Sequence, residues 1–272
     1  MLDIITVSDF KSASDPVRTE ETIYKQLVSN KNKIDSIYSY AALPLAETIN
    51  SRGLPATQNL IDSICENYKD KKLFFVCQHI LVRALNFHNH LVFTPHATIL
   101  DSFIPIPHYS CNYDLNYVKP WEERKYLFSF MGSFKTHQTR LSACEKLKNE
   151  PDCLFIDTGD WHFYHDSSKK AENKRKYIEL LGDTKYSLCP RGTGPSTIRM
   201  WESMAMGSCP VILSDYLKYP LEFDLDSDLW TSVKEDFTLS DIKGALPEDY
   251  DNTEYFKYFS NDKLYESILS EI

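Results

Sequence analysis

Short apolar runs alternate along the chain with segments in which apolar residues recur every three or four positions. The first pattern predicts buried strands, and the second predicts amphipathic helices. This alternation is typical of a parallel α/β protein, because parallel strands need a crossover connection that is usually a helix. We predict strands near 4–7, 37–40, 73–78, 91–94, 126–132, 153–157, 186–190 and 209–215, and helices near 20–28, 57–68, 139–149, 167–181 and 196–206, with one or two more in the tail 251–272.

Prolines interrupt the pattern between the two halves of the chain. Pro105, Pro107 and Pro120 lie close together there. Proline fixes φ and removes a backbone donor, so this segment is predicted to be an extended connector. We therefore predict two domains, 1–118 and 119–272, with a final helix that can pack back on the first domain.

The composition is that of an ordinary globular protein, with 272 residues of which 42% are hydrophobic and 25% charged. The formal net charge is −9. Broad nucleic-acid binding needs a basic surface, so we expect no nucleic-acid partner. Aromatic residues make up 13% of the chain, which leaves rings available for stacking on sugars.

The cysteines and the apolar runs bear on location. The seven cysteines are odd in number, form no C-x-x-C pair and lie mostly in apolar runs, which is typical of buried free thiols in a reducing compartment. No apolar run approaches the ~20 residues of a membrane span, and the first residues lack a signal-peptide pattern. We expect a cytoplasmic protein without a membrane partner.

Glycine is concentrated in one stretch. The chain has eight glycines, and Gly192, Gly194 and Gly207 all fall within KYSLCPRGTGPSTIRMWESMAMGSCPVILSD at 185–215. An apolar run precedes the first two, and a helical pattern follows them. Glycine lets backbone N–H groups approach a ligand closely. A strand, a flexible turn and a helix start are thus expected in one place.

The residues around these glycines suit an anion. Arg191 supplies a fixed positive charge, and Pro195 fits the first helical turn, where its missing N–H costs nothing. Ser196 or Thr197 adds a hydroxyl at the positive end of the helix dipole. Together they predict an anion site, most simply for a diphosphate.

Farther along the predicted helix, Ser196, Arg199 and Glu202 are three residues apart and share a polar face. A carboxylate one turn beyond a phosphate-binding terminus can accept from both ribose hydroxyls. The alternative is a plain turn followed by a solvated Arg199–Glu202 ion pair. The stretch matches neither G-x-G-x-x-G nor G-x-x-x-x-G-K-[ST], so an epimerase, a dehydrogenase or a P-loop hydrolase lacks motif support.

Three stretches resemble motifs of the exostosin-like glycosyltransferases, glycosyltransferase family 47. The most specific is LCPRGTGPSTIRMWESMAMGSCPVILSD at 188–215, which follows the family's signature segment with a small difference in spacing at the serine. The others are RKYLFSFMGSFKTHQTR at 124–140 and DSFIPIPHY at 101–109. They occur in the family's order, whereas the first hundred residues are only faintly similar.

The resemblance implies a GT-B architecture, with two Rossmann-like domains facing a cleft, and inverting sugar transfer without a metal or other cofactor. A UDP-sugar would be the co-substrate, held on the C-terminal domain, and an oligosaccharide or glycoprotein acceptor would lie on the N-terminal domain. The donor-site residues carried over are Arg191, Gly192, Thr193, Gly194, Pro195, Ser196 and Thr197 for the diphosphate, Arg199 and Glu202 on the helix with Glu202 on the ribose, and Gly132, Ser133 and Arg140 after the strand at 126–132.

Inverting transfer also needs a general base. The run KKLFFVCQHIL ends near His79 and is faintly similar to a family motif whose aspartate is Ile80 here. Imidazole titrates near neutrality, so His79 is the first choice and Asp101 the alternative. The nearby His88, His90 and His96 are read as loop histidines, since their spacing is not diagnostic of zinc; the carboxylate-rich 224–228 is read as a loop or helix start.

Within the family, a short chain with free thiols resembles the cytosolic enzymes of large algal DNA viruses, which glycosylate capsid proteins. That likeness favours xylose, although glucuronic acid, galactose and arabinose also occur among the relatives. A catalytically inactive sugar-nucleotide-binding or scaffold module is the non-enzymatic alternative. The oligomeric state is left open.

Overall fold

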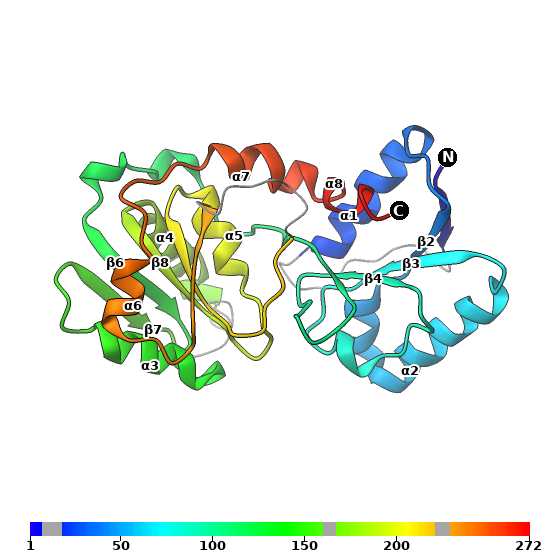
Figure 1. Ribbon diagram of the computed structural model, residues 1–272, viewed down its shortest axis with the longest axis horizontal. Coiled ribbons are helices and arrows are strands. Elements are labelled where there is room, and N and C mark those ends of the chain that lie inside the picture. Colours follow the sequence, from blue (N-terminus) through cyan, green and yellow to red (C-terminus); the bar gives the residue numbers. More distant parts are fainter. Residues whose placement is uncertain (7–17, 160–166, 221–228) are drawn as a thin grey trace. The chain divides into compact units, whose positions relative to one another are not determined.

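The computed structural model describes residues 1–6, 18–159, 167–220 and 229–272 (Figure 1). The chain divides into two compact units, each built on a five-stranded sheet. Every strand pairing within these sheets is parallel, which confirms the predicted α/β class and is compatible with a GT-B glycosyltransferase. Unit 1 comprises Met1–Tyr109, Leu217–Phe223 and Tyr258–Ile272; unit 2 comprises Ser110–Tyr216 and Asp224–Lys257.

In unit 1 the strands follow one another across the sheet in chain order, from β1 to β5. Figure 1 shows α2 on one side of this sheet and α1 with α8 on the other. The elements are β1 (Asp3–Thr6), α1 (Thr19–Asn30), β2 (Tyr38–Ala42), α2 (Leu45–Asn67), β3 (Lys72–Val76), β4 (Leu91–Thr94), β5 (Ile104–Pro105) and α8 (Glu266–Leu269), with short 3₁₀ turns at Lys31–Lys33, Val82–Ala84 and Asn261–Lys263.

Alternate residues of β3 serve the two faces. Leu73 and Phe75 pack with Ile61 of α2, whereas Phe74 packs with Ile23 of α1 and Ile268 of α8. Successive side chains of a strand point to opposite faces, so a strand buried on both sides reads as a continuous apolar run. The C-terminal helix therefore contributes to the core of unit 1.

Helix α2 is longer than the sequence pattern predicts. The predicted helix covers 57–68, whereas α2 begins at Leu45 and contains a kink at Gly53, where φ is +79°. A positive φ is open to glycine at little cost. Gly53, followed by Pro55, breaks the apolar periodicity and so conceals the first turns of the helix.

In unit 2 the spatial strand order is β10-β9-β8-β6-β7. The chain moves outward from β6 to β7, then returns to place β8 on the other side of β6. Ligands of open α/β sheets bind beyond the carboxyl ends of the strands at such a reversal.

The elements of unit 2 are β6 (Tyr126–Gly132), α3 (Gln138–Leu147), β7 (Cys153–Asp157), α4 (Ser167–Gly182), β8 (Thr184–Pro190), α5 (Ile198–Ala205), β9 (Cys209–Leu213), β10 (Thr231–Val233), α6 (Leu239–Gly244) and α7 (Thr253–Tyr258), with 3₁₀ turns at Leu115–Tyr117, Trp121–Glu123 and Phe134–Thr136.

In the sequence, the boundary between the two units follows Tyr109, which is earlier than the boundary near residue 118 that the prolines suggest. Tyr113 and Val118 pack against Tyr177 and Leu181 of α4, so the connector is divided: Pro105 and Pro107 belong to unit 1, and the part after Tyr109 belongs to unit 2.

Arg124 fixes the base of unit 2. Its guanidinium donates to the carbonyls of Lys119 at 3.1 Å, Thr184 at 2.7 Å and Met206 at 3.0 Å. Gly207 follows with φ +63°, and a Cβ there would lie 2.8 Å from Nη2 of Arg124. Arg124 thus joins the start of β8 to the residue that follows α5.

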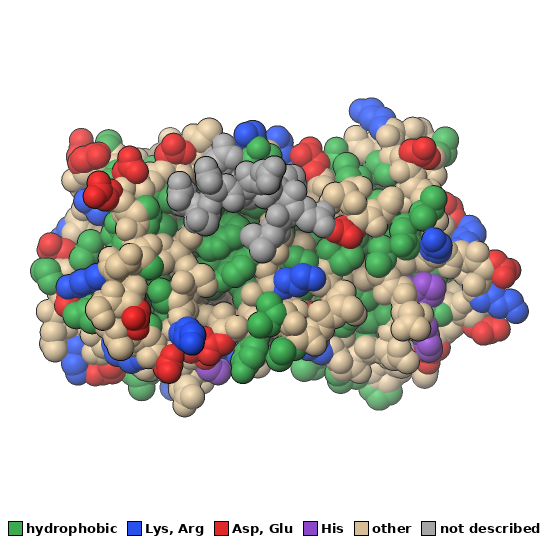
Figure 2. Space-filling model, viewed as in Figure 1, with side chains coloured by type: hydrophobic (Ala, Val, Ile, Leu, Met, Phe, Trp, Pro, Cys, Tyr) green, Lys and Arg blue, Asp and Glu red, His purple; other side chains and the backbone are tan. Residues whose placement is uncertain are grey.

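The surface carries charges of both signs. On the face shown in Figure 2, acidic and basic side chains are interspersed. Within the described parts of the chain, none of the helices combines the length and the apolar character that a bilayer crossing demands.

Candidate functional site

The loops after β6 and β8 lie at the carboxyl edge of the unit 2 sheet, where the strand order reverses. β6 ends at Gly132, and β8 ends at Pro190 directly before Arg191. Three predicted arginines come together there. Arg140 donates to carbonyls of both loops. The positive charge of Arg199 contributes to lowering the pKa of Arg140.

Arg199 lies in the first turn of α5 and is only 7% exposed. Its Nη2 donates to the carbonyl of Met131, and its guanidinium lies 4.1 Å from the ring centroid of Phe130. Its Nε and Nη1 are buried and have no partner in the described part of the chain. A buried guanidinium with unused donors is costly, so these two groups point to a ligand that brings acceptor oxygens.

Arg140 ties the two loops together. Its Nε donates to the carbonyl of Arg191 at 3.1 Å, and its Nη1 donates to that of Ser133 at 3.1 Å. A Cβ on Gly192 would lie 2.7 Å from Arg140 Nη2, so glycine is needed for this approach. Burial, with the charge of Arg199, lowers the pKa of Arg140 to about 10, which still leaves it protonated at neutral pH.

Arg191 is more exposed than Arg199, with 22% of its side chain accessible. Its Nη2 donates to the carbonyl of Thr193 at 3.3 Å, and its Nη1 lies 3.9 Å from Oε1 of Glu235. Its backbone N–H donates to the carbonyl of Leu213 at 3.0 Å, which anchors the main chain next to β9. The side chain therefore rests on its own loop and beside a carboxylate.

Helix α5 begins later than predicted. Its first residue is Ile198, and the preceding Thr197 is extended, with φ −139° and ψ 135°. Pro195 thus lies before the helix and not in its first turn. Gly194 and Pro195 are buried, whereas Thr193 is exposed. The loop presents its backbone, with Ser196 and Thr197 half-buried, ahead of the helix start.

Glu202 is buried, which contradicts the alternative of a solvated Arg199–Glu202 ion pair. It is 3% exposed, and every residue from Arg199 to Ala205 is buried. Its Oε1 accepts from the backbone N–H and the side-chain amide of Asn112 at 2.9 and 2.7 Å, and its Oε2 accepts from the Tyr177 hydroxyl at 2.7 Å. Burial raises the pKa of Glu202, while Tyr177, Asn112 and Arg199 oppose the rise. A ribose could use this carboxylate fully only by displacing one of these donors.

His79, the first choice for the base, follows β3 in unit 1. Its Nδ1 accepts from the backbone N–H of Leu81 at 3.1 Å, and its Nε2 lies 3.1 Å from Oδ1 of Asn50. Because Nδ1 is the acceptor, Nε2 carries the proton and donates to Asn50. The imidazole can accept a proton from a substrate on Nδ1 only if the contact with the Leu81 N–H opens.

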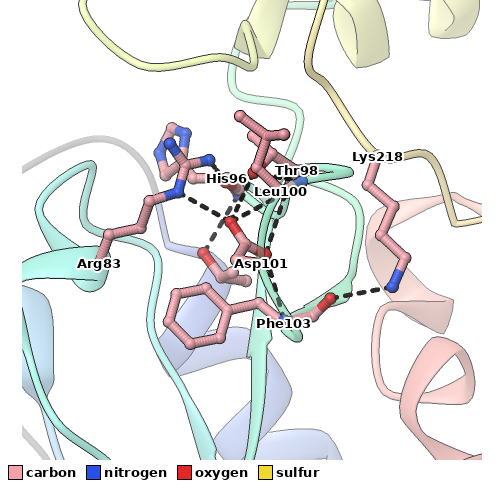
Figure 3. A network of polar contacts seen from close by, with 8 residues as sticks. Arg83, His96, Thr98, Leu100, Asp101, Phe103 and Lys218 are labelled. Carbon is pink, nitrogen blue, oxygen red and sulfur yellow. Dashed lines mark hydrogen bonds and ion pairs between the residues drawn. The ribbon is translucent and has the colours of Figure 1, made fainter.

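Asp101, the alternative base, organises the turn between β4 and β5 (Figure 3). Its carboxylate accepts from Arg83 Nε at 2.8 Å, from the Thr98 hydroxyl at 2.6 Å, and from the backbone N–H groups of Thr98 and Phe103. Lys218 donates to the Phe103 carbonyl at 3.2 Å on the same turn. These four donors occupy the carboxylate oxygens of Asp101 and tie them to the turn.

Sequence reasoning missed a buried carboxylate, Glu20, in the first turn of α1. It is 4% exposed and accepts from the backbone N–H groups of Gln78 at 2.8 Å and Ala46 at 3.2 Å. Its own N–H donates to the Gln78 side chain at 2.9 Å. Desolvation raises the pKa of Glu20 to about 8. Acidic residues are common in first helical turns, so nothing in the sequence distinguished this one.

The other histidines have separate contacts. His88 lies 2.6 Å from Asp62, His90 accepts from the Leu73 N–H at 3.4 Å, and His96 is buried. Among the described residues, no group of three or more His, Cys, Asp or Glu side chains is arranged to hold a metal. The carboxylates at 224–228 lie outside the described residues.

Comparison with known proteins identifies the family. The Exostosin GT47 domain matches residues 60–232, which run from within α2 to β10 and include the whole unit 2 site. The chain belongs to the exostosin GT47 family. The resemblance drawn from the three stretches is therefore confirmed, and the match extends farther toward the N-terminus than those stretches.

Curated relatives of this GT47 chain are similar over parts of their length. It is 25% identical over 186 residues to the Exostosin-1 homolog of Caenorhabditis elegans, covering 61% of this chain and 47% of that protein. It is 30% identical over 94 residues to ribitol-5-phosphate xylosyltransferase 1 of Danio rerio, covering 34% and 21%. It is 27% identical over 139 residues to Exostosin-1 of Drosophila melanogaster, covering 46% and 18%. The chain thus spans about half or less of each relative.

Proposed function

We propose that this GT47 chain is an inverting glycosyltransferase that moves a sugar from a UDP-sugar to a hydroxyl of an oligosaccharide or glycoprotein. The observation that carries the proposal is the buried Arg199 guanidinium, whose Nε and Nη1 have no acceptor among the residues that the structure describes. It lies beside Gly132, at the point where the strand order reverses. A nucleotide diphosphate supplies the charge and the oxygens that such a site needs.

The arginines also support a reaction without a metal. When the acceptor oxygen bonds to the anomeric carbon, the bond to the diphosphate breaks and its electron pair leaves with UDP. Arg140, Arg191 and Arg199 offer fixed positive charge where that negative charge develops. We propose that they take the place of a divalent cation and that no other cofactor is needed. Activity should then persist in excess EDTA.

The proton of the acceptor hydroxyl needs a base in unit 1. Of the two sequence candidates, His79 is the better supported, because Asp101 already accepts from four donors, one of them the Arg83 guanidinium. Release of the Leu81 N–H would free the lone pair on Nδ1 of His79. We therefore keep His79 as the proposed base.

The sugar and the setting are further proposals. Xylose is supported by the similarity to a relative named as a xylosyltransferase, whereas two other relatives carry the exostosin name. A glycan on a viral capsid protein as acceptor, and a cytoplasmic location, rest on the sequence resemblance. The free state of all seven cysteines is compatible with a reducing compartment.

The test is a thermal-shift screen followed by a turnover assay. A ligand that binds only the folded state stabilises it by about 2.7 kcal/mol at a hundred times Kd. UDP and UDP-sugars, UDP-xylose among them, should raise the melting temperature, and NAD⁺ should not. The preferred donor should release UDP when glycan acceptors are added. Binding without turnover for any donor would favour the inactive module, and stabilisation by NAD⁺ alone would favour an epimerase or dehydrogenase.

A further inference from the structure

Glu235 is a fixed carboxylate at the edge of the donor site. It lies two residues after β10, and its Oε2 accepts from the Thr139 hydroxyl at 2.8 Å. Its Oε1 accepts from the Asp215 N–H at 3.3 Å, while its own N–H donates to Oδ1 of Asp215 at 2.9 Å. Bonds from α3 and from the loop after β9 thus hold the carboxylate in place.

The partner of this fixed anion is a less restrained cation. Arg191 Nη1 lies 3.9 Å from Glu235 Oε1, at the outer limit of an ion pair. The side chains of Arg191 and Glu235 are 22% and 19% exposed. Its other contacts are long, to the carbonyls of Gly192 at 3.4 Å and Thr193 at 3.3 Å. By contrast, Arg140 donates to two carbonyls at 3.1 Å, and Arg199 donates to the buried carbonyl of Met131. Arg191 is therefore the arginine of the three that can change partners most easily.

The surroundings explain why Arg191 needs an anion. Burial and the positive charge of Arg199 lower the pKa of Arg140. Arg191 adds a third positive charge to this site, and Glu235 is the carboxylate that lies beside it. A diphosphate offers more charge and a better match to the guanidinium fork than a carboxylate 3.9 Å away. A bound nucleotide should therefore win the competition for Arg191.

We propose that Glu235 is an internal counter-ion, which pairs with Arg191 when the donor site is empty and yields it to the diphosphate when nucleotide binds. The inference rests on the proposed function. Glu235 does not contact the reacting atoms; it acts through Arg191. By competing with the ligand it weakens the binding of UDP, and so favours release of the product after transfer.

The test compares UDP affinities by titration calorimetry in metal-free buffer. Glu235→Gln removes the charge and keeps a similar shape, and Asp236→Asn is the matched control, since it removes one charge from the adjacent, exposed residue. Glu235→Gln should bind UDP roughly two- to fivefold tighter, the usual worth of a partly exposed ion pair. Asp236→Asn should bind as the wild type does. In an Arg191→Ala background, Glu235→Gln should have no effect.

Equal or weaker binding by a Glu235→Gln protein with a wild-type melting temperature would overturn the inference. So would the same tightening in the Arg191→Ala background. If Glu235→Gln does not fold, Glu235→Asp serves instead, because its shorter side chain moves the negative charge away from Arg191. Tightened UDP binding by this variant supports the inference, and unchanged binding overturns it. Inorganic pyrophosphate is the second probe. A wild type that binds pyrophosphate but not UDP contradicts the proposed function, and the counter-ion comparison can then be made with pyrophosphate alone.

Discussion

A side chain at Gly132 would collide with Arg199, because a Cβ there would lie 2.8 Å from Nη2 of the guanidinium. The same nitrogen donates to the carbonyl of Met131, the residue before. The end of β6 and the first turn of α5 are therefore fitted to each other across 68 residues of sequence. The glycine that ends the strand makes room for the guanidinium of Arg199, whose Nε and Nη1 have no acceptor in the described part of the chain.

Displacing this guanidinium should weaken nucleotide binding. Gly132→Ala should reduce UDP affinity roughly tenfold or more, since hydrogen bonds to charged groups contribute about 1.5–3 kcal/mol. Arg199→Lys should do the same, because lysine lacks the fork of donors. Gly244→Ala is the control, as a Cβ there meets nothing within 4 Å. Calorimetry on the three variants is decisive: wild-type affinity in Gly132→Ala and Arg199→Lys would refute the role of Arg199.

Glu202 should matter for stability even without nucleotide. Glu202→Ala leaves Asn112 and Tyr177 without their buried acceptor, and each such donor costs about 1–3 kcal/mol. Tyr177→Phe removes one donor together with its need for a partner, so it should cost less. Among the ligand-free proteins, the wild type should have the highest melting temperature, Tyr177→Phe a lower one and Glu202→Ala the lowest. If Glu202→Ala melts like the wild type, the hydrogen bonds described here do not stabilise the unit.

Glu20 should make stability depend on pH. Its pKa is raised from 4.5 in the unfolded chain to about 8 in the fold, so between these values the folded state holds a proton that the unfolded state releases. Its contribution is complete below pH 4.5 and is lost as pH rises toward 8, by at most about 1.4 kcal/mol per pH unit. Glu20→Gln cannot ionise and should lack this decline. Urea unfolding between pH 5 and 8.5 gives the free energy of unfolding of both proteins at each pH. If this free energy changes with pH in the same way in both, Glu20 does not titrate in this range.

The two candidate bases should separate by their side effects. His79→Ala should lower turnover by roughly 10²–10⁴-fold with UDP affinity unchanged, the usual effect of losing a general base. Asp101→Ala should lower the melting temperature, because it releases Arg83 and the turn that contains Thr98. His88→Ala, on an exposed histidine, is the control for His79. Retention of full turnover by His79→Ala would move the search for the base to other groups of unit 1.

The second half of the chain could be predicted well from its pattern. The strands at 126–132 and 153–157 agree with β6 and β7 residue for residue, because these apolar runs are bounded by turn residues. Two glycines of the candidate site also stand out in the sequence, and at Gly132 and Gly192 arginine side chains approach the backbone closely. Where a side chain approaches the backbone this closely, the position requires glycine, and a glycine is visible in the sequence.

The environments of the polar site residues could not be predicted. Arg199 and Glu202 read as one polar face of a helix, but their partners, Met131, Asn112 and Tyr177, are distant in sequence. The spacing of residues on one helix reveals which side chains share a face and gives no information on what covers that face. For the same reason Glu20, whose partner Gln78 is 58 residues away, gave no signal.

The order of strands in unit 2 links ligand binding to folding. Arg140 donates to the carbonyl of Arg191, 51 residues later, and between them the chain must complete β7, α4 and β8. No short segment can therefore hold the candidate site, which forms only when these elements are assembled. A core substitution far from the arginines, such as one at Leu188, would lower the apparent nucleotide affinity in proportion to the fraction of molecules that it unfolds.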